Sequence, residues 1–421
     1  MLNRLKLKSE FSRNVLTLMT GTTIAQAIPI AISPILTRIY TPEDFGVLAL
    51  FVAIVSVFGS IASGRYELAI MLPEKDEDAI NVFALGLIIT TIISLILLLV
   101  ILLFNEYLIE LLGNREIGVW LYFIPITVFF IGLFNILSYF NNRKKQYKDI
   151  AMATIIKSII LAVVQLTIGF LKQGASGLIG GQILSNIFAN MRLLKNIIKD
   201  KNLILRISKV KIVALGKRYR NFPLISLPSN FINVLNQNLV NMLISTVYNI
   251  KTLGFYSLVQ RVLGVPSSLI GSSIGQVFFQ QATKERQESG YAIKTFISTV
   301  IRLLIIAIPL YSMLFLIVEN LFLFVFGEKW QIAGEYAKTL VPLFFIRFIS
   351  SPVSVINTVF EKQLYGLYIS LILLTTSLIV IFFSFYYHID TESFFSYLSL
   401  CLSVDYSLFL LFYYFISKGK F

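Results

Sequence analysis

The sequence predicts an all-α membrane protein that crosses the bilayer many times. Of its 421 residues, 57% are hydrophobic and only 14% are charged, and the mean hydropathy is +0.80. Soluble domains are about half apolar and about a quarter charged, so this balance lies outside their usual range. The apolar residues fall in long runs, and a run of about 20 residues is what an α-helix needs to cross the hydrocarbon core. These observations exclude a soluble enzyme, a disordered chain and a disulfide scaffold.

Twelve such runs are present, and each predicts a membrane-spanning helix. The first and the seventh are the least apolar of the twelve. The loops on one side are all short, which leaves no room for an extracytoplasmic catalytic domain. The expected limits of the spans are 14–36, 45–63, 79–104, 117–140, 150–171, 175–194, 222–247, 253–278, 293–318, 336–360, 364–387 and 393–416.

The distribution of lysine and arginine predicts the side of the membrane on which each loop lies. Cytoplasmic loops carry an excess of these residues. Of the 36 Lys and Arg, twenty-six lie in alternate segments that begin with the N-terminus, six lie in the opposite segments and four lie within spans. This split predicts that both termini are cytoplasmic. It also accounts for most of the net charge of +14, so nucleic acid is not an expected partner.

A strongly basic connector divides the chain into two halves. Residues 191–221 contain ten basic residues and a single acid, Asp200. This pattern predicts an amphipathic cytoplasmic linker that lies on anionic lipid. We therefore expect an N-terminal six-helix lobe over 1–194, a basic linker over 195–221 and a C-terminal six-helix lobe over 222–421.

The two halves also resemble each other in sequence. At an offset of 208, the segment 36–50 aligns with 244–258, and Tyr40 falls on Tyr248, Gly46 on Gly254 and Leu50 on Leu258. Because each half has six expected spans, both halves insert in the same direction, which makes the repeat a parallel one. Such a repeat predicts a transporter that rocks between inward-open and outward-open states around a site between the lobes.

Two spans carry polar side chains on one helical face, at positions related by the repeat. Amides are costly against lipid, so such a face is expected to meet protein or water. Helix packing is the simpler explanation for the hydroxyl residues. We expect the amides of the seventh span to line a hydrated cavity and to bind sugar hydroxyls. The residues are Thr22, Gln26, Ser33 and Thr37 in the first span, and Asn230, Asn233, Gln237 and Asn241 in the seventh.

Basic residues within the spans are candidates for binding an anionic substrate. A charged side chain in the membrane needs a partner or water. Four cations against one deep acid, Asp405, predict an electropositive cavity, and arginine matches the geometry of phosphate. Asp405 is expected to pair with one of these cations, with proton or sodium coupling as the alternative. The basic candidates are Lys157, Arg261, Arg302 and Arg347 within spans, and Arg38 and Arg65 at span ends.

Scarce residue types exclude several kinds of chemistry. Cys401 is the only cysteine and His388 the only histidine, so a disulfide, a zinc cluster or a His-dependent catalytic triad is not expected. The sequence lacks a phosphate-binding P-loop motif, and its basic, polar N-terminus is not typical of a cleaved signal peptide. We therefore expect no enzyme activity, no cofactor and no bound metal.

Two motifs in the first half indicate a family. The segment Leu36-Thr-Arg-Ile-Tyr-Thr-Pro-Glu-Asp-Phe-Gly46 is followed by Ser63-Gly-Arg-Tyr-Glu-Leu-Ala-Ile-Met-Leu-Pro73 and an acidic run. These motifs resemble those of the polysaccharide biosynthesis proteins of the oligosaccharide flippase family, within the multidrug/oligosaccharidyl-lipid/polysaccharide exporter superfamily. The twelve spans and two lobes extend the resemblance over the whole chain. Arg65 and Glu67 are carried over as motif positions, where substrate contact and a structural salt bridge are equally expected, with ion coupling a weaker alternative for Glu67.

The resemblance implies a function in surface polysaccharide biosynthesis. Members of the family move undecaprenyl-diphosphate-linked repeat units to the outer leaflet of the bacterial cytoplasmic membrane. The implied product is O-antigen of lipopolysaccharide, capsule or another polymer, the implied partners are other glycan-assembly proteins, and a monomer is expected as the transport unit. Two alternatives stay open, a multidrug or cation antiporter of the same superfamily and a membrane-embedded glycan polymerase or ligase. The first is expected to bury several acids, and the second normally needs a large outer loop.

Overall fold

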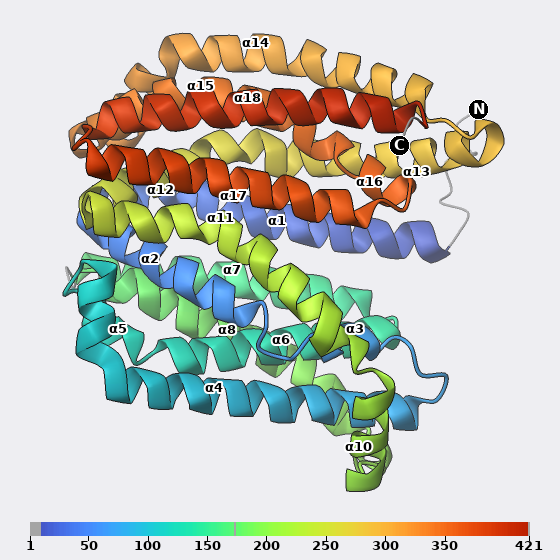
Figure 1. Cartoon of the computed structure of the whole chain (residues 1–421). Helices are drawn as coiled ribbons and strands as arrows, with labels where there is room; N and C mark the ends of the chain where they lie inside the picture. Colours follow the sequence, from blue (N-terminus) through green and yellow to red (C-terminus); the bar gives the residue numbers. More distant parts are fainter. Residues whose placement is uncertain (1–9, 172–173, 420–421) are drawn as a thin grey trace, which may run out of the picture. The chain divides into compact units, whose positions relative to one another are not determined.

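The computed structural model describes residues 10–171 and 174–419, and all regular secondary structure within these ranges is helical (Figure 1). By its internal contacts the chain forms two compact units, Met1–Asn238 and Leu239–Phe421, and the boundary falls within one helix. Residues 195–221 pack as part of the first unit. The division of the sequence at 195 and 222 therefore stays a prediction. Arg4, Lys6, Lys8, Lys172 and Lys420, which contribute to the predicted orientation, lie outside the described residues.

The first unit is built from long helices joined by short turns. A π-helical turn over Phe222–Ser226 precedes its last helix, which continues into the second unit. In chain order the helices are α1 (Glu10–Ile39), α2 (Pro42–Gly59), α3 (Tyr66–Ala69), α4 (Asp76–Leu112), α5 (Ile117–Leu121), α6 (Ile124–Arg143), α7 (Tyr147–Phe170), α8 (Ser176–Lys199), α9 (Lys201–Ile204), α10 (Lys209–Arg218) and α11 (Leu227–Val247).

The second unit is also built from long helices, and it has fewer short helices between them. A π-helical turn over Ser267–Gly271 joins α12 and α13 into one continuous helical segment. A short 3₁₀ turn over Glu328–Trp330 precedes α15. The helices are α12 (Ile250–Pro266), α13 (Ser272–Ser289), α14 (Ile293–Phe326), α15 (Gln331–Val353), α16 (Ile356–Val359), α17 (Gln363–Tyr386) and α18 (Thr391–Ser417).

Ten helical segments of the described chain are long and apolar enough to cross a membrane. They are formed by α1, α2, α4, α6, α7, α12 with α13, α14, α15 with α16, α17 and α18. The all-α, multi-pass membrane class is therefore confirmed. The other two expected spans coincide with α8 and α11, which have 24 and 21 residues but carry more polar side chains. The number twelve and the cytoplasmic placement of both termini stay predictions.

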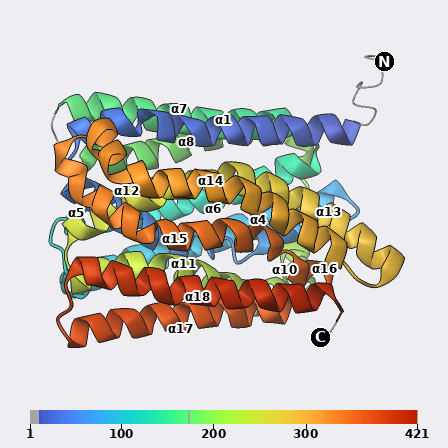
Figure 2. The ribbon, with the colours of Figure 1, turned by 90° about the horizontal axis from the view of Figure 1, so that it is seen from above.

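Close packing of α1 on α7 holds the first helix in its unit (Figure 2). Gly21 makes this possible, because a Cβ at that position would lie 2.5 Å from the Cβ of Ala151. The hydroxyl of Ser158 on α7 donates a 2.7 Å hydrogen bond to the carbonyl of Ala25 on α1. Small residues and a hydroxyl bond are the usual means of helix association where no hydrophobic driving force acts.

The turn between α1 and α2 explains the motif that begins at Tyr40. Thr41 is the N-cap of α2 and forms a capping box with Asp44, while Pro42 occupies the first helical turn. These residue types satisfy amide groups that a helix start leaves unpaired. The Tyr40 hydroxyl donates a 2.6 Å hydrogen bond to the Gln165 carbonyl of α7, and burial raises the pKa of Tyr40 to about 12. The tyrosine is therefore a protonated, structural donor.

The second unit has the same construction at its first turn. The Asn249 side chain caps α12 by accepting a 2.8 Å hydrogen bond from the amide of Thr252. Tyr248, the repeat partner of Tyr40, donates a 3.2 Å hydrogen bond to the Ile389 carbonyl between α17 and α18. In both units a tyrosine before the cap of the second helix thus binds a carbonyl of the last helix pair, as the internal repeat predicts.

A second turn recurs with a different spacing. Lys145 and Glu361 have left-handed backbones, with φ of 57° and 58°. The amide that follows each of them closes the same loop, because Gln146 bonds the Asn141 carbonyl at 2.9 Å and Lys362 bonds the Asn357 carbonyl at 2.7 Å. The offset here is 216 rather than 208, so the second unit has eight additional residues between the two turns.

Candidate functional site

The backbone turns sharply between α2 and α3, and Arg65 stands at the turn. Gly64 and Arg65 are both left-handed, with φ of 63° and 64°. Arginine rarely adopts this conformation, and strained residues of this kind cluster at functional sites. The turn directs the guanidinium toward α3, where Nη1 lies 3.2 Å from Oε1 of Glu67.

The Arg65–Glu67 pair leaves arginine donors available. The Glu67 side chain is only 3% exposed and also accepts a hydrogen bond from the Ser63 hydroxyl, so the carboxylate is fixed on two sides. The Arg65 side chain is 23% exposed, and its Nε is buried without a hydrogen-bond acceptor in the described structure. A guanidinium oriented in this way can bind a phosphate with its remaining N–H groups.

The amide-rich helix α11 begins at the same corner. Asn230 Nδ2 donates a 3.1 Å hydrogen bond to the carbonyl of Ser60, just beyond the end of α2. Asn233, Gln237 and Asn241 follow at spacings of three or four residues, which places all four amides on one face of the helix. Gln237 is exposed, and Asn241 Oδ1 is buried without a hydrogen-bond donor in the described part of the chain. The structure therefore joins Asn230 to the turn that leads from α2 to Arg65 and Glu67.

The polar stripe on α1 divides into two parts. Thr22 and Gln26 are exposed, and so is Arg38 near the end of the helix. Ser33 and Thr37 are buried and donate to the carbonyls of Pro29 and Pro34, at 2.7 and 3.1 Å. The two buried hydroxyls satisfy backbone groups beside in-helix prolines, whereas Gln26 keeps its amide at the surface.

The basic residues within the helices have distinct surroundings. Lys157 of α7 is half-buried, with Nζ 5.3 Å from the centre of the Phe134 ring on α6. Arg261 of α12 is also half-buried. Arg302 is exposed on α14 beside Ile301 and Ile305, whose large exposed side chains are typical of a lipid-facing helix.

Arg347 lies among aromatic side chains of the second unit. Its guanidinium carbon is 5.8 Å from the centre of the Phe344 ring, a cation–π distance. The face of an aromatic ring stabilises the charge without neutralising it, so Arg347 stays available to an anion.

The ion pair that was expected for Asp405 is not seen among the described residues. Its Oδ2 is buried there without a hydrogen-bond donor. The ion pairs seen among the described residues use other carboxylates, mostly at the ends of helices. Among these residues no group of acids, histidines and cysteines is placed to hold a metal ion.

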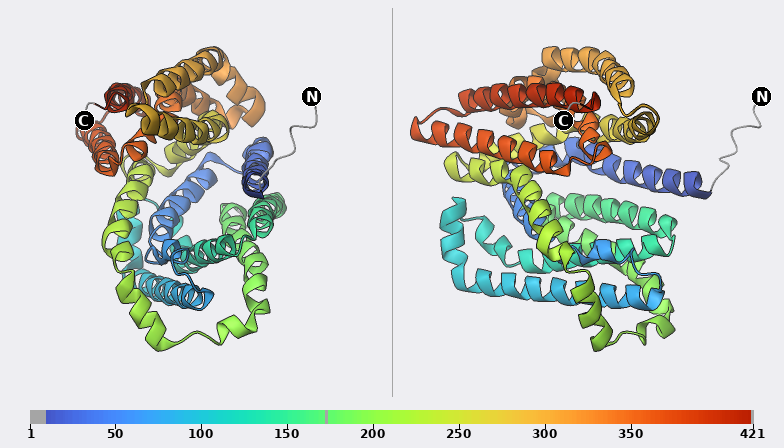
Figure 3. Two further views of the ribbon diagram at one scale, coloured as in Figure 1. Left: turned by 90° about the vertical axis from the view of Figure 1, so that its right-hand side faces the viewer. Right: turned by 45° about the vertical axis from the view of Figure 1, so that its right-hand side comes forward.

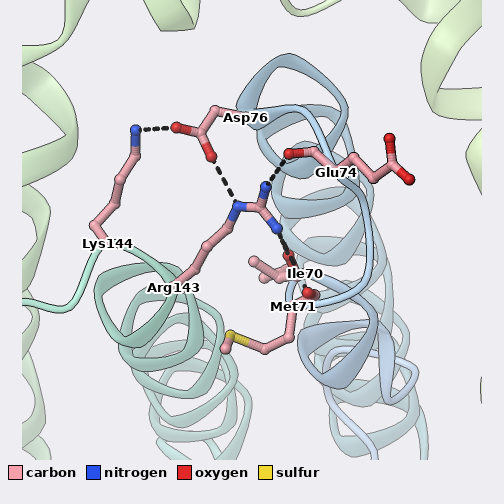
Figure 4. A network of polar contacts seen from close by, with 6 residues as sticks. All are labelled: Ile70, Met71, Glu74, Asp76, Arg143 and Lys144. Atoms are coloured by element: carbon pink, nitrogen blue, oxygen red, sulfur yellow. Dashed lines mark hydrogen bonds and ion pairs between the residues drawn. The ribbon is translucent and has the colours of Figure 1, made fainter. Parts of the chain in front are cut away.

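The first unit contains a polar network that was not predicted from the sequence. Arg143 at the end of α6 donates to Oδ1 of Asp76 at 2.8 Å and to the carbonyls of Glu74 and Ile70 at 3.1 and 3.3 Å (Figure 4). Lys144 donates to Oδ2 of the same aspartate at 2.6 Å. From the sequence, Arg143 and Lys144 contributed only to the predicted orientation of the loops across the membrane. The acidic run after Pro73 was the available signal, because acids beside a basic loop favour pairing.

The fold is that of transporters of the MOP superfamily. An inward-facing multidrug resistance MATE family transporter of this superfamily superposes with a TM-score of 0.72 at 14% identity, over 96% of this chain and 95% of that one. The lipid II flippase MurJ in an inward closed conformation gives 0.71 at 15% identity, over 96% and 90%. The chain therefore shares the fold of these two transport proteins.

The chain belongs to the polysaccharide biosynthesis protein family, whose model matches residues 35–334. The succinoglycan biosynthesis transport protein ExoT of Rhizobium meliloti is 23% identical over 317 residues, which are 71% of this chain. The match spans 59% of the length of that relative. The matched proteins with a named role are transporters rather than enzymes, as the sequence predicted for this chain.

Proposed function

We propose that the protein is a flippase that moves undecaprenyl-diphosphate-linked oligosaccharide repeat units across the bacterial cytoplasmic membrane for polysaccharide biosynthesis. Family membership and the transport relative support this proposal, as does the fold shared with a flippase of a lipid-linked glycan precursor. The relative is named for succinoglycan. O-antigen is therefore one of several surface or secreted polymers that the product could form.

The observation that carries the proposal is the Arg65 corner. A diphosphate needs fixed cationic donors, and Arg65 is oriented by the buried Glu67 while its side chain stays partly exposed. Hydrogen bonds to charged groups contribute roughly 1.5–3 kcal/mol each. Arg65 is therefore proposed as the first contact of the diphosphate, with Glu67 as its positioning residue.

The remaining candidates are assigned by chemistry. Amides bind sugar hydroxyls, so Gln26 and the α11 amides Asn230, Asn233, Gln237 and Asn241 are proposed to contact the glycan. Further phosphate contacts are proposed for Arg38, Lys157, Arg261, Arg302 and Arg347, of which Arg347 is supported most by its aromatic surroundings. Asp405, with its unpaired oxygen, and more weakly Glu67 are the proposed ion-coupling residues.

The proposed mechanism is alternating access. Parallel repeats of this kind transport by rocking of one repeat against the other. The prenyl chain stays in the lipid, since its transfer into a polar cavity is unfavourable. The diphosphate and glycan move through the cavity, where basic and amide groups replace their hydration.

The test is a flipping assay in proteoliposomes with a polyprenyl-diphosphate oligosaccharide labelled on its sugar. Wild-type protein should expose the label to an enzyme outside the vesicles. Arg65→Ala should reduce the rate at limiting substrate by roughly 10- to 100-fold, since it removes a charge-assisted hydrogen bond. Arg65→Lys should retain part of the rate, because it keeps the charge but loses the planar fork.

The matched control is Arg192→Ala. Arg192 pairs with Asp149 at 2.5 Å and lies on α8, a helix that carries none of the proposed substrate contacts. This variant should flip at the wild-type rate. Transport of a cationic dye without flipping of the glycan lipid would replace the proposal with the multidrug alternative, which the fold also accommodates.

A further inference from the structure

The basic linker of the first unit has one face docked on the protein. Leu203, Leu215 and Tyr219 are buried in the same apolar cluster as Ile70 and Phe83. The Tyr66 hydroxyl donates a 3.0 Å hydrogen bond to the Gly216 carbonyl. The linker therefore has a fixed position and orientation within its unit.

Hydrogen bonds to α4 complete this docking. Asn81 Nδ2 donates to the Arg206 carbonyl at 3.0 Å, and its Oδ1 accepts from the Ser208 amide at 2.8 Å. Lys211 Nζ donates to Glu77 at 3.2 Å. The asparagine binds the linker backbone in both directions, so the residues between α9 and α10 cannot rotate freely.

The opposite face of the linker exposes apolar and basic side chains together. Leu205 is 81% exposed and Val210 is 78% exposed. Large apolar side chains of this kind are unfavourable in water. Basic residues lie beside them, so an ordinary apolar protein surface is not a suitable partner for this face. The exposed basic residues are Lys199, Lys201, Arg206, Lys209, Lys217, Arg218 and Arg220, of which Arg206 pairs with Glu77.

The place of the linker in the fold indicates what covers this face. After α8 the chain runs round the outside of the first turns of α4 before it enters α11 (Figure 3). A Cβ at Gly216 would lie 3.3 Å from Leu85 of α4, and exposed aliphatic residues begin directly beyond it, at Ile88 and Ile92. Those residues are typical of a helix in contact with hydrocarbon. The linker therefore lies at the level where lipid headgroups meet hydrocarbon.

The charge of this surface is almost uncompensated. The linker has one acid, the exposed Asp200, which caps α9, while on α4 Asp76 pairs with Arg143 and Lys144, and Glu77 pairs with Lys211 and Arg206. The exposed lysines and arginines of the linker thus produce a positive field. Basic residues beside exposed apolar residues are the pattern of a helix that lies on an anionic leaflet.

We propose that the exposed face of residues 199–220 binds the headgroups of anionic phospholipids, with Leu205 and Val210 inserted at the headgroup boundary. The linker then anchors the first unit to the leaflet surface around α4. This binding surface is independent of the glycan lipid, which the transport proposal places elsewhere. Anionic lipid is the occupant because charge, apolar exposure and the position beside lipid-facing residues all match it.

A fluorescent probe at Val210 tests the proposal. Full-length Cys401→Ser, Val210→Cys protein, labelled with a polarity-sensitive dye, is reconstituted in phosphatidylcholine alone or mixed with phosphatidylglycerol. We expect blue-shifted emission and protection from an aqueous quencher in the mixed bilayer, both reversed by high salt because headgroup attraction is screened. Equal emission in the two bilayers, or a shift insensitive to salt, would overturn the proposal.

Charge variants supply the second measurement. Lys209→Gln with Lys217→Gln should lower the ratio of inserted to water-exposed probe by roughly fivefold per charge removed. The matched control is Lys284→Gln with Lys294→Gln, two exposed lysines of the second unit, which should leave the ratio unchanged. An equal loss in both variants contradicts a local surface. A shift that requires added cell extract in either bilayer would assign the face to a protein partner instead.

Discussion

Tyr40 and Arg65 show how two residues of one motif region take different roles because their surroundings differ. The Tyr40 hydroxyl is buried against the Gln165 carbonyl and serves as a fixed donor. Arg65 keeps a partly exposed guanidinium and a donor without an acceptor in the described structure. The surroundings of the two side chains therefore distinguish Tyr40, a structural residue, from Arg65, a candidate binding residue. In the sequence, both residues are equally specific parts of the family motifs.

Gly177 provides a test of the Tyr40 contact. A Cβ at Gly177 would lie 2.0 Å from the Tyr40 hydroxyl oxygen, so Gly177→Ala should lower stability by about 1–3 kcal/mol. Tyr40→Phe alone should cost about 1 kcal/mol for the lost hydrogen bond. The double variant should lose less than the sum, since the phenyl ring lacks the atom nearest to the new methyl group. Unfolding in detergent micelles measures all three.

Gly366→Ala is the matched control for this cycle. Nothing lies within 4 Å of a Cβ at Gly366 in helix α17, so alanine should be neutral or stabilising by roughly 0.5–1 kcal/mol. Strict additivity of Gly177→Ala and Tyr40→Phe would contradict the contact.

The Arg65–Glu67 pair allows the structural and transport roles of Arg65 to be separated. Arg65→Ala leaves the buried Glu67 carboxylate without its cation and should lower stability by roughly 1–3 kcal/mol. Adding Glu67→Gln should restore stability because the amide is neutral. We expect this stable double variant to remain defective in flipping. A double variant that flips at the wild-type rate would mean that Arg65 has only a structural role.

At the scale of elements, the two repeats differ most where the candidate corner lies. In the first unit the second helix stops at Gly59 and the chain turns through Arg65. In the second unit a π-helical turn after Pro266 carries the helix onward into α13. A proline removes one backbone donor, and the wider turn keeps the helix continuous around it. Within the described residues, this sharp backbone turn is therefore present in the first unit and absent from the second.

The docking of the linker on α4 should depend more on the Asn81 hydrogen bonds than on the linker's salt bridges. Asn81→Ala removes both bonds to the linker backbone and should increase amide hydrogen exchange over 203–210. Lys211→Gln should change it little, because exposed ion pairs contribute only about 0–1 kcal/mol. Hydrogen exchange with mass spectrometry compares the two variants, with α7 as the internal reference. Faster exchange for Lys211→Gln than for Asn81→Ala would contradict this ranking.

At the scale of the whole molecule, the repeat organises both units. The capped turn after Tyr40 recurs after Tyr248, and the left-handed turn at Lys145 recurs at Glu361. Each unit therefore contains the same two local turns in the same order along the chain.

Single cysteines test the number of spans. In a Cys401→Ser background, Leu171→Cys and Lys251→Cys should react with a membrane-impermeant maleimide from outside the cell. Lys199→Cys and Arg220→Cys should react only after permeabilisation, because α8 and α11 are predicted to cross the bilayer. Reaction of Leu171→Cys and Lys199→Cys from the same side would remove α8 from the set of spans.

Most of the helices could be predicted, but their ends could not. The expected span 79–104 lies inside α4 (Asp76–Leu112), and 293–318 lies inside α14 (Ile293–Phe326). Hydropathy reports the part of a helix that contacts hydrocarbon, whereas the backbone bonds continue into the polar interface. In the candidate site, Arg65 and Glu67 were found by motif, and Asn230 by its polar face. The hydrogen bond from Asn230 to the Ser60 carbonyl could not be predicted, because it joins residues 170 positions apart.

The sequence by itself determined the membrane class, the helical architecture and the repeat, because these follow from local hydropathy and from identities at a fixed offset. The tertiary structure alone decided that Tyr40 is buried, that one oxygen of Asp405 is buried without a donor among the described residues, and that one face of the linker is docked. Each of these outcomes depends on which side chains from distant segments approach within a few ångströms. Sequence patterning along a single helix does not contain that information.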